Sequence, residues 1–216
     1  KVKKGETIGV IGGTGSGKSS VCYMIPRFYD VTSGIVKVDG INVKDYSLKD
    51  LRTRIGIVPQ KAVLFTGSLR DNMRWRKGDA TDEEIMEAIK IAQAEEFVSE
   101  LENGLNSRVQ AGGKNFSGGQ RQRLTIARAL VGKPEILIMD DSASALDFAT
   151  DYNLRKAIRE NTDNMTVFII SQRVNTIRNA DQIIVLDKGK IVGIGKHEEL
   201  LENCDVYKEI YTSQTK

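Results

Sequence analysis

Residues 12–19 read Gly-Gly-Thr-Gly-Ser-Gly-Lys-Ser, and the rest of the chain is best understood outward from them. They fit the pattern G-x-x-x-x-G-K-[ST], which is typical of a loop that holds phosphate groups. A β-prone run at Thr7–Ile11 precedes the loop, and Ser19–Phe28 is predicted to be a helix that ends near Pro26. Glycines let backbone N–H groups turn toward phosphate oxygens, and the helix adds the positive end of its dipole. The segment therefore predicts a phosphate-binding turn between a strand and a helix.

Side chains of this loop and one later acid have expected roles in binding a nucleotide and Mg²⁺. Lys18 would neutralise the β- and γ-phosphates, and the Ser19 hydroxyl would ligate Mg²⁺. Asp140 ends the apolar run 136–139, where it would hold Mg²⁺ through water at the carboxyl edge of a sheet. The other expected phosphate-binding positions are Gly13, Thr14, Gly15, Ser16, Gly17 and Ser20. A plain glycine-rich turn and a strand-end Asp that caps a helix are the alternatives, and the loop alone leaves every class of P-loop NTPase open.

Hydrophobic patterns along the chain predict an α/β fold, a P-loop NTPase core with a mostly parallel sheet. Short β-prone runs alternate with helical patterns, which favours parallel strands covered by helices. The predicted strands are 55–58, 136–139, 166–170, 182–186 and 190–195. Asp39-Gly40, between alternating runs, predicts a small antiparallel hairpin. Glu198–Gln214 is predicted to be one amphipathic helical tail.

The middle of the chain has a different pattern, which predicts a helical insertion. Thr81-Asp82-Glu83-Glu84 is a helix-capping sequence, and the helix that follows is expected to run to Ile91. We therefore expect one domain over 1–216, with a catalytic core at 1–60 and 131–216 and a helical subdomain at 61–130.

Composition limits the class of protein. The 216 residues are 40% apolar and 28% charged, as in an ordinary globular domain, and 32 basic against 29 acidic residues do not favour nucleic acid as a partner. Two distant cysteines favour a reducing setting, and no apolar run reaches the ~20 residues of a membrane span. Because the chain starts at Lys1 without a methionine, almost at the phosphate loop, we expect a fragment of a longer polypeptide.

The family is indicated by Phe116-Ser117-Gly118-Gly119-Gln120, which resembles the L-S-G-G-Q signature of ABC-type ATPases with Phe in place of Leu. Serine and two glycines open a helix there, so N–H groups and the helix dipole face outward. The resemblance implies that Ser117, Gly118, Gly119 and Gln120 contact the γ-phosphate of an ATP bound to a partner domain. A flexible Ser-Gly-Gly loop is the alternative.

The resemblance spans almost the whole chain. Val58-Pro59-Gln60 is similar to the family's Q-loop, which implies that Gln60 ligates Mg²⁺ and senses the γ-phosphate. Ser144–Asp147 is similar to the D-loop, Leu64–Asn72 to the coupling-groove region of exporters, and Gly195–Leu200 to their C-terminal segment. The aromatic residue that stacks on adenine in the family is expected upstream of Lys1.

Three departures from the family pattern matter. The segment Ser107–Gly113 before the signature has Ala111 and Gly112 where many exporters carry acidic and basic residues. The other two concern hydrolysis. The general base is usually Glu and the switch residue usually His, and Asp141 and Gln172 stand in those places. Asp is shorter than Glu by one C–C bond, ~1.5 Å, and a misplacement of ~1 Å can cost on the order of 100-fold in rate. Gln hydrogen-bonds phosphate but carries no titrating proton near neutral pH. Both changes act on hydrolysis, so ATP binding should outlast catalysis, unless the two are neutral variants of an active site.

The resemblance implies the ATP-binding domain of one half of a heterodimeric, multidrug-type ABC exporter, bound to ATP and Mg²⁺. Its own site would hydrolyse slowly, whereas its signature would complete the active site of a second, non-identical ATPase domain. Its other partners would be transmembrane domains, which would hold it at the cytoplasmic face of the inner membrane. The alternatives are a fully active homodimeric transporter ATPase and a nucleotide-gated binding module without turnover. A DNA-repair ABC ATPase is disfavoured, because no long coiled coil separates Lys18 from Ser117.

Overall fold

The computed structural model describes residues 1–142, 146–162 and 164–215. The chain divides into two compact units, which we describe separately. The first comprises Lys1–Gly56, Glu135–Asp141 and Asn164–Lys216, and the second comprises Ile57–Pro134 and Ser142–Asp163. The expected division of roles between a catalytic core and a helical subdomain stays a prediction.

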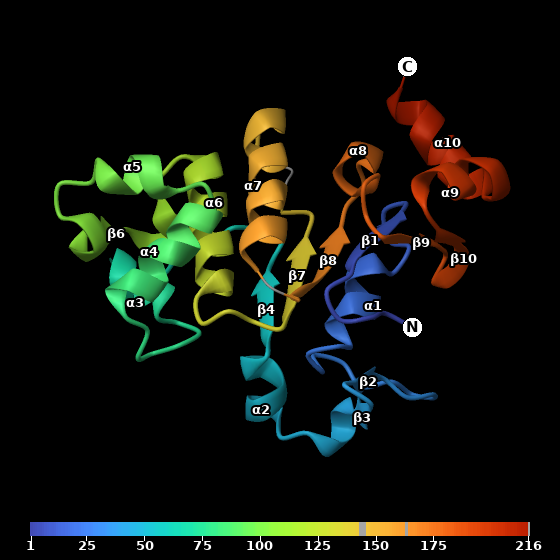
Figure 1. The fold of residues 1–216 in the computed structure, drawn as a ribbon, viewed down its shortest axis with the longest axis horizontal. Helices are drawn as coiled ribbons and strands as arrows, with labels where there is room; N and C mark the ends of the chain where they lie inside the picture. The colour runs from blue at the N-terminus through green and yellow to red at the C-terminus, as the bar shows by residue number, and fades with distance from the viewer. Residues whose placement is uncertain (143–145, 163, 216) are drawn as a thin grey trace. The chain divides into compact units, whose positions relative to one another are not determined.

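A six-stranded sheet in the order β10-β9-β1-β8-β7-β4 contains the strands of the first unit, and β4 begins in that unit and continues past its boundary at Gly56 (Figure 1). Its strands are β1 (Thr7–Gly12), β4 (Ile55–Val58), β7 (Ile136–Asp140), β8 (Thr166–Ile170), β9 (Gln182–Asp187) and β10 (Lys190–Gly195). Strand β1 runs parallel to β8 and β9, β7 runs parallel to β8, and β10 runs antiparallel to β9. The apolar side chains of β1 and, apart from the half-buried Ile136, those of β7 are almost completely buried. The predicted α/β fold with a mostly parallel sheet is therefore confirmed.

The remaining elements of this unit are short. They are α1 (Lys18–Tyr23), β2 (Lys37–Val38), β3 (Ile41–Asn42), η1 (Val43–Asp45), α2 (Leu48–Thr53), α8 (Val174–Ile177), α9 (His197–Asn203) and α10 (Asp205–Gln214). Strands β2 and β3 form the predicted antiparallel hairpin, with positive φ at both Asp39 and Gly40 of the turn. Two left-handed residues match the right-handed twist of the paired strands, which is why Asp-Gly suits this turn.

Two helices differ from their predicted extents. Helix α1 ends at Tyr23 rather than Phe28, because Pro26 lacks the N–H that a continuing helix would need, and Arg27 turns left-handed with φ of 54°. The tail is two helices rather than one, because the backbone of Cys204 is extended between them (φ −131°, ψ 102°). This break lets α9 bury Leu200 and α10 bury Tyr207.

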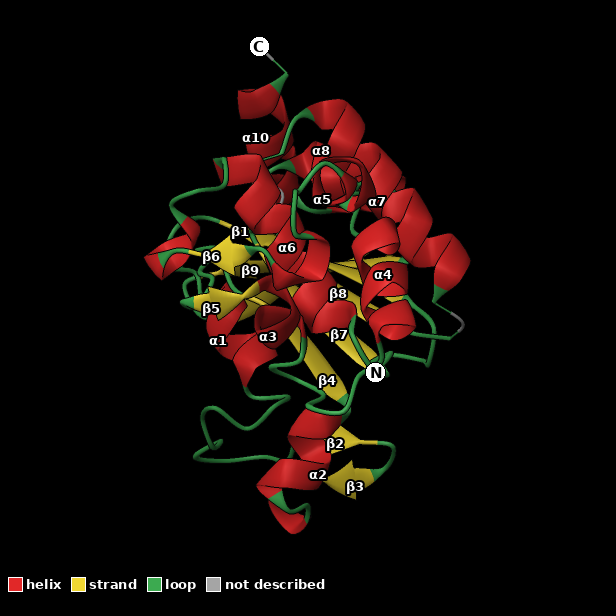
Figure 2. Cartoon of the chain, turned by 90° about the vertical axis from the view of Figure 1, so that its left-hand side faces the viewer, coloured by secondary structure: helices red, strands yellow, loops and turns green. Residues whose placement is uncertain are grey.

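The second unit is mainly helical (Figure 2). Its elements are β5 (Gly67–Ser68), α3 (Leu69–Met73), α4 (Asp82–Ile91), α5 (Glu95–Ser99), η2 (Gly104–Asn106), β6 (Arg108–Val109), η3 (Ala111–Gly113), α6 (Gly118–Leu130) and α7 (Phe148–Asn161). Helix α4 packs against α6 and α7 and buries Ile85 and Ile89. Thr81 and Glu84 form the predicted capping box at the start of α4.

Candidate functional site

The phosphate-binding loop follows directly from β1 and is braced by the turn between β9 and β10. Strand β1 ends at Gly12, whose backbone lies so close to Leu186 that a Cβ there would clash with the Leu186 carbonyl oxygen. The Gly189 N–H donates to the Ser16 carbonyl at 3.1 Å. Gly17 precedes α1 with φ of 96°, a conformation that a residue with a Cβ rarely adopts. The sequence pattern therefore specifies glycine where the backbone is crowded or left-handed.

Lys18 points back over its own loop. Its ammonium Nζ donates to the carbonyls of Gly12 and Gly13, both at 2.8 Å, and only 8% of the residue is exposed. Burial lowers the pKa of Lys18, and the nearby carboxylates of Asp140 and Asp141 partly offset that effect. Because the Lys18 ammonium is bonded to backbone carbonyls of the loop, a phosphate bound in the loop would be a suitable counter-ion for it.

The buried hydroxyl of Ser16 is a further feature of the loop that fits polyphosphate binding. Ser16 is 4% exposed, and within the described part of the chain its buried hydroxyl has no hydrogen-bond partner. Because a buried hydroxyl left unpaired is unfavourable, the loop carries a donor ready for a ligand oxygen. Around it, Gly13, Thr14 and Gly15 are exposed, and a Cβ at either glycine would meet no atom within 4 Å. Open backbone, a buried hydroxyl and a cation are the donor set that a nucleotide phosphate requires.

Asp140, the last residue of β7, is the acid that the structure joins to this loop. Its Oδ1 accepts from the Ser19 hydroxyl at 3.0 Å and its Oδ2 from the Tyr23 hydroxyl at 2.8 Å, and Asp140 is 6% exposed. Ser19 and Asp140 are thus adjacent, as expected for two residues that share Mg²⁺ directly and through water. Sequence analysis missed Tyr23, although it lies on α1 four residues after Ser19, one helical turn away. Burial and the hydrogen bond to Asp140 raise the pKa of Tyr23 above its ordinary value, which keeps the hydroxyl a donor.

Asp141 and Gln172 follow neighbouring strands at the same edge of the sheet. Val10, Ile170 and Asp140 lie side by side in the strand register, so the loops after β1, β8 and β7 leave the sheet together. Asp141 turns left-handed with φ of 44°, and its N–H donates to the Ile170 carbonyl at 2.8 Å. Gln172 is exposed two residues beyond β8. The structure therefore places both positions at the edge where the phosphate loop lies, and their catalytic roles stay predictions.

The signature residues lie in the second unit and begin a helix, as predicted. Ser117 caps α6: its hydroxyl accepts from the Gln120 N–H at 3.2 Å, and the Gln120 side chain accepts from the Ser117 N–H at 2.9 Å. The N–H groups of Gly118 and Gly119 take no part in this box. Phe116 is buried edge-on against Phe97, with ring centroids 6.4 Å apart, so an aromatic side chain suits this position.

The model of the ABC transporter family matches residues 1–144 of this sequence. This chain belongs to the ABC transporter family. It is 46% identical over 216 residues to an uncharacterized ABC transporter ATP-binding protein of Mycobacterium tuberculosis, and 42% identical over 214 residues to the ATP-dependent lipid A-core flippase of Vibrio vulnificus. Each alignment covers 99% of this chain and 37% of the relative, so the chain spans about a third of the length of these relatives.

A solved structure of the same family has the same fold. It is that of a bacterial Atm1-family ABC exporter with ATP bound, which superposes with a TM-score of 0.93 at 34% identity over 98% of this chain and 37% of that chain. The phosphate loop, Asp140 and the signature are therefore parts of an ABC ATP-binding domain, and such domains bind ATP.

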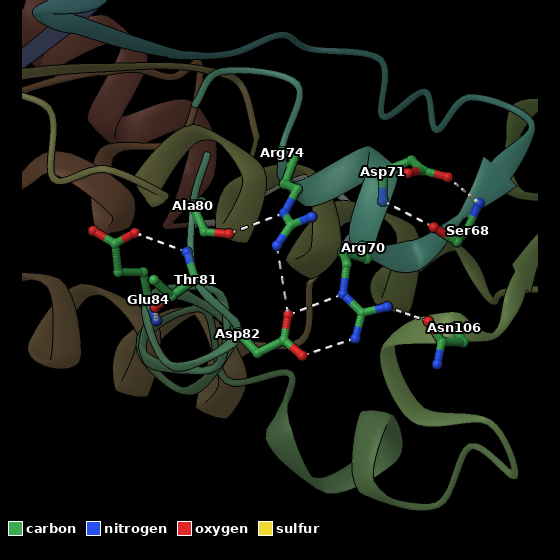
Figure 3. Close-up of polar contacts among 9 residues, drawn as sticks. All are labelled: Ser68, Arg70, Asp71, Arg74, Ala80, Thr81, Asp82, Glu84 and Asn106. Atoms are coloured by element: carbon green, nitrogen blue, oxygen red, sulfur yellow. Dashed lines mark hydrogen bonds and ion pairs between the residues drawn. The ribbon is translucent and has the colours of Figure 1, made fainter. Parts of the chain in front are cut away.

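In this ABC domain, the region that resembles the exporter coupling groove is held by a network of charged and capping groups (Figure 3). Arg70 on α3 donates to both carboxylate oxygens of Asp82, at 2.9 and 2.8 Å, and to the Asn106 side chain. Ser68 and Asp71 form a capping box at the start of α3. These contacts connect α3, α4 and the η2 turn within the second unit.

Two predicted features of the ABC pattern have a different status. Gln60 follows β4 in the second unit, so its part in binding Mg²⁺ stays a prediction. Ser144 and Ala145 of the D-loop lie outside the described residues, whereas Asp147 caps α7 by accepting from the Thr150 N–H at 2.9 Å. Among the described residues, no helix combines the length and the apolar character that crossing a membrane requires.

Proposed function

We propose that this chain is the ATP-binding domain of one half of a heterodimeric ABC exporter, with an ATP site of its own that binds tightly and turns over slowly. The observation that carries the proposal is the pairing of an intact phosphate loop with Asp141 and Gln172 at the same sheet edge. Similarity to a lipid flippase and to an Atm1-family exporter supports an exporter as the whole assembly.

The binding half of the proposal rests on groups that the chain already arranges. Lys18 would exchange two loop carbonyls for phosphate oxygens, and the Ser16 hydroxyl would gain a partner. Ser19 and Asp140, 3.0 Å apart, would hold Mg²⁺, which supplies charge neutralisation to the phosphates when bound.

The slow half of the proposal concerns how a water molecule would be oriented. Asp141 leaves the sheet in a left-handed turn with a carboxylate one C–C bond shorter than that of Glu, so its oxygens would stop ~1.5 Å short of the position a Glu reaches. Gln172 could donate an amide hydrogen to a phosphate oxygen, but it could not shuttle a proton near neutral pH. General-base assistance contributes ~100–10,000-fold in rate, so a poorly placed base leaves binding intact and slows turnover.

The signature gives the proposal its asymmetry. Ser117–Gln120 presents the helix N-terminus and the N–H groups of Gly118 and Gly119, which have no acceptor within the helix and would stabilise charge on an ATP held by a partner domain. The partner is inferred to be non-identical, because a second copy of this chain would bring the same Asp and Gln to both sites.

Repairing the hydrolytic pair tests this proposal. Gly118→Val should silence the partner's site in the assembled transporter and leave this domain folded, because a Cβ at Gly118 would meet no atom of the described, non-adjacent residues within 4 Å. In that background, Asp141→Glu with Gln172→His should raise residual phosphate release on the order of 10–100-fold, and more than the two single changes multiplied, since the groups act as a unit.

The matched control is Asp141→Asn with Gln172→His, which keeps the shorter side chain and removes its charge, and it should show no gain. A fully active homodimeric enzyme would hydrolyse ATP rapidly without any of these changes, and Gly118→Val would silence both of its sites, so the repair would restore no turnover. A nucleotide-gated module would stay inactive after it. Either result contradicts the proposal.

A further inference from the structure

The last residue of α10 holds the loop that carries Gln172. Nε2 of Gln214 donates to the Gln172 carbonyl at 2.6 Å, and Oε1 of Gln214 accepts from the Val174 N–H at 2.9 Å. One side-chain amide thus makes the donor and acceptor bonds that a neighbouring strand would make across two residues. The 42 and 40 positions that separate these partners make the contact tertiary.

The loop needs such a partner, because it opens a helix of only four residues. Helix α8 begins at Val174, and its N-cap residue, Arg173, offers no side-chain hydrogen bond. The first N–H groups of a helix have no acceptor within the helix, so Gln214 supplies one from a distant part of the chain. On the other side, the Ser171 N–H donates to the Val10 carbonyl at 3.1 Å. Gln172 is therefore held between β1 and α10.

Helix α10 is itself anchored, so Gln214 is more than a loose surface residue. Tyr207 on α10 is fully buried, and its hydroxyl lies 2.7 Å from Nδ1 of His197 at the start of α9. Helix α10 also packs against β1, β9 and α8 in the first unit. Because α10 is anchored and ends in the Gln214 amide, that amide can support the backbone of Gln172.

We propose that Gln214 is a positioning residue that sets the placement of residue 172 toward the ATP γ-phosphate. This inference rests on the proposed role of Gln172. Neither bond occupies the side chain of residue 172, so that side chain stays available while its backbone is held. A rate falls steeply when a group near the reacting atoms shifts by a fraction of an ångström.

The test uses the assembled transporter with Gly118→Val, Asp141→Glu and Gln172→His, in which turnover reports this chain's own site. Gln214→Leu keeps the side-chain bulk and removes both hydrogen bonds. We expect kcat for ATP hydrolysis to fall about tenfold while KM for ATP stays unchanged, since the phosphate loop is untouched. Hydrogen–deuterium exchange at the Val174 amide should rise at least about fivefold.

Ser213→Ala is the matched control, because its hydroxyl donates only to the Ile210 carbonyl of its own helix, and it should change neither readout. Unchanged Val174 exchange in Gln214→Leu overturns the inference, as does faster exchange with unchanged kcat. A repaired background without turnover instead contradicts the proposed function, and Val174 exchange in the otherwise unaltered protein then still decides whether Gln214 holds the loop.

Discussion

The helix starts of α1 and α6 both contain glycine and are both assigned to ATP phosphates, but they are built differently. The loop before α1 has no side-chain cap: Gly17 turns left-handed, and a buried lysine and serine hydroxyl stand beside the open backbone. The start of α6 is closed by its own Ser117–Gln120 capping box and contains no acidic or basic residue in its first turn apart from Arg121.

This difference separates a site that binds from a surface that completes a site. The loop before α1 brings a full charge and an unpaired hydroxyl, so it can hold a polyphosphate from one chain. The α6 start uses its side chains on its own backbone and offers N–H groups and a dipole, which are individually weak. Such a surface is useful against a ligand that is already held by another domain.

The largest effect is expected when the charge of Lys18 is removed from the loop before α1. Lys18→Ala should weaken Mg-ATP binding on the order of 1,000-fold, because Lys18 is the only charged side chain of the loop and would make charge-assisted bonds to two phosphates. Titration calorimetry on the purified protein measures this, with Lys49→Ala on the exposed face of α2 as control. Equal loss in both variants, or none in Lys18→Ala, would show that the loop does not bind through Lys18.

The second expected effect compares the two helix starts within the assembled transporter. Ser117→Ala should lower total steady-state ATPase activity on the order of 100-fold, because the Ser117 hydroxyl, whose oxygen accepts from the Gln120 N–H, still has its hydrogen to donate toward developing charge on the partner's ATP. Asp141→Ala should lower it far less, because it acts on a site that is already slow. Both are read from phosphate release at saturating ATP.

Thr81→Ala controls for the lost helix cap, since Thr81 caps α4 with the same capping-box geometry as Ser117 and lies outside both the signature and residues 64–72. Each cap is worth ~1 kcal/mol of stability, so the two variants should unfold at similar temperatures while only Ser117→Ala loses activity. If Asp141→Ala is as damaging as Ser117→Ala, both sites hydrolyse and the asymmetric model is wrong.

A smaller effect sharpens the account of the first site. Tyr23→Phe removes the hydroxyl that donates to Asp140 Oδ2 at 2.8 Å, and Ser19 remains as a partner. Because the buried Asp140 carboxylate then keeps only one of its two donors, the free energy of unfolding should fall by ~1 kcal/mol. For a chain of this size, Tm should fall by about 2–4 °C. Tyr29→Phe makes the same substitution at an exposed ring and should leave Tm unchanged.

The smallest effect concerns the tail that supports Gln214. Burial lowers the pKa of His197 below its ordinary value of 6.5; Glu198 opposes this shift and Arg178 adds to it. Below about pH 6.5 the unfolded chain therefore binds a proton that the folded chain does not, so stability is lost as the pH falls through this range.

His197→Gln can still bond to the Tyr207 hydroxyl but does not titrate. Between pH 7.5 and 5.5 its Tm should fall by on the order of 2 °C less than that of the unaltered protein, as followed by thermal unfolding. Identical pH profiles would mean that His197 titrates alike in the folded and unfolded chain.

Much of the first site could be predicted from local sequence, because its chemistry is contained in contiguous segments. The strand, the glycine turn and the helix after it have short-range signals, and so do Asp140 at the end of an apolar run and the capping box of Ser117. The ends of helices were harder to predict from local sequence. The stop of α1 at Tyr23 depends on how Pro26 and Arg27 turn, and the break at Cys204 contains neither glycine nor proline.

What the sequence determined by itself is the set of groups that follow one another along the chain: a cation, hydroxyls and glycines for phosphate, and a carboxylate after a buried strand. What only the tertiary structure decided is which distant groups complete them. Parallel pairing of β1, β8 and β7 brings Asp140, Asp141 and Gln172 to the edge that carries the loop, because strands in register end together. The contacts of Tyr23 with Asp140 and of Gln214 with the Gln172 loop join residues more than 35 positions apart, so no local pattern encodes them and only packing against the sheet does.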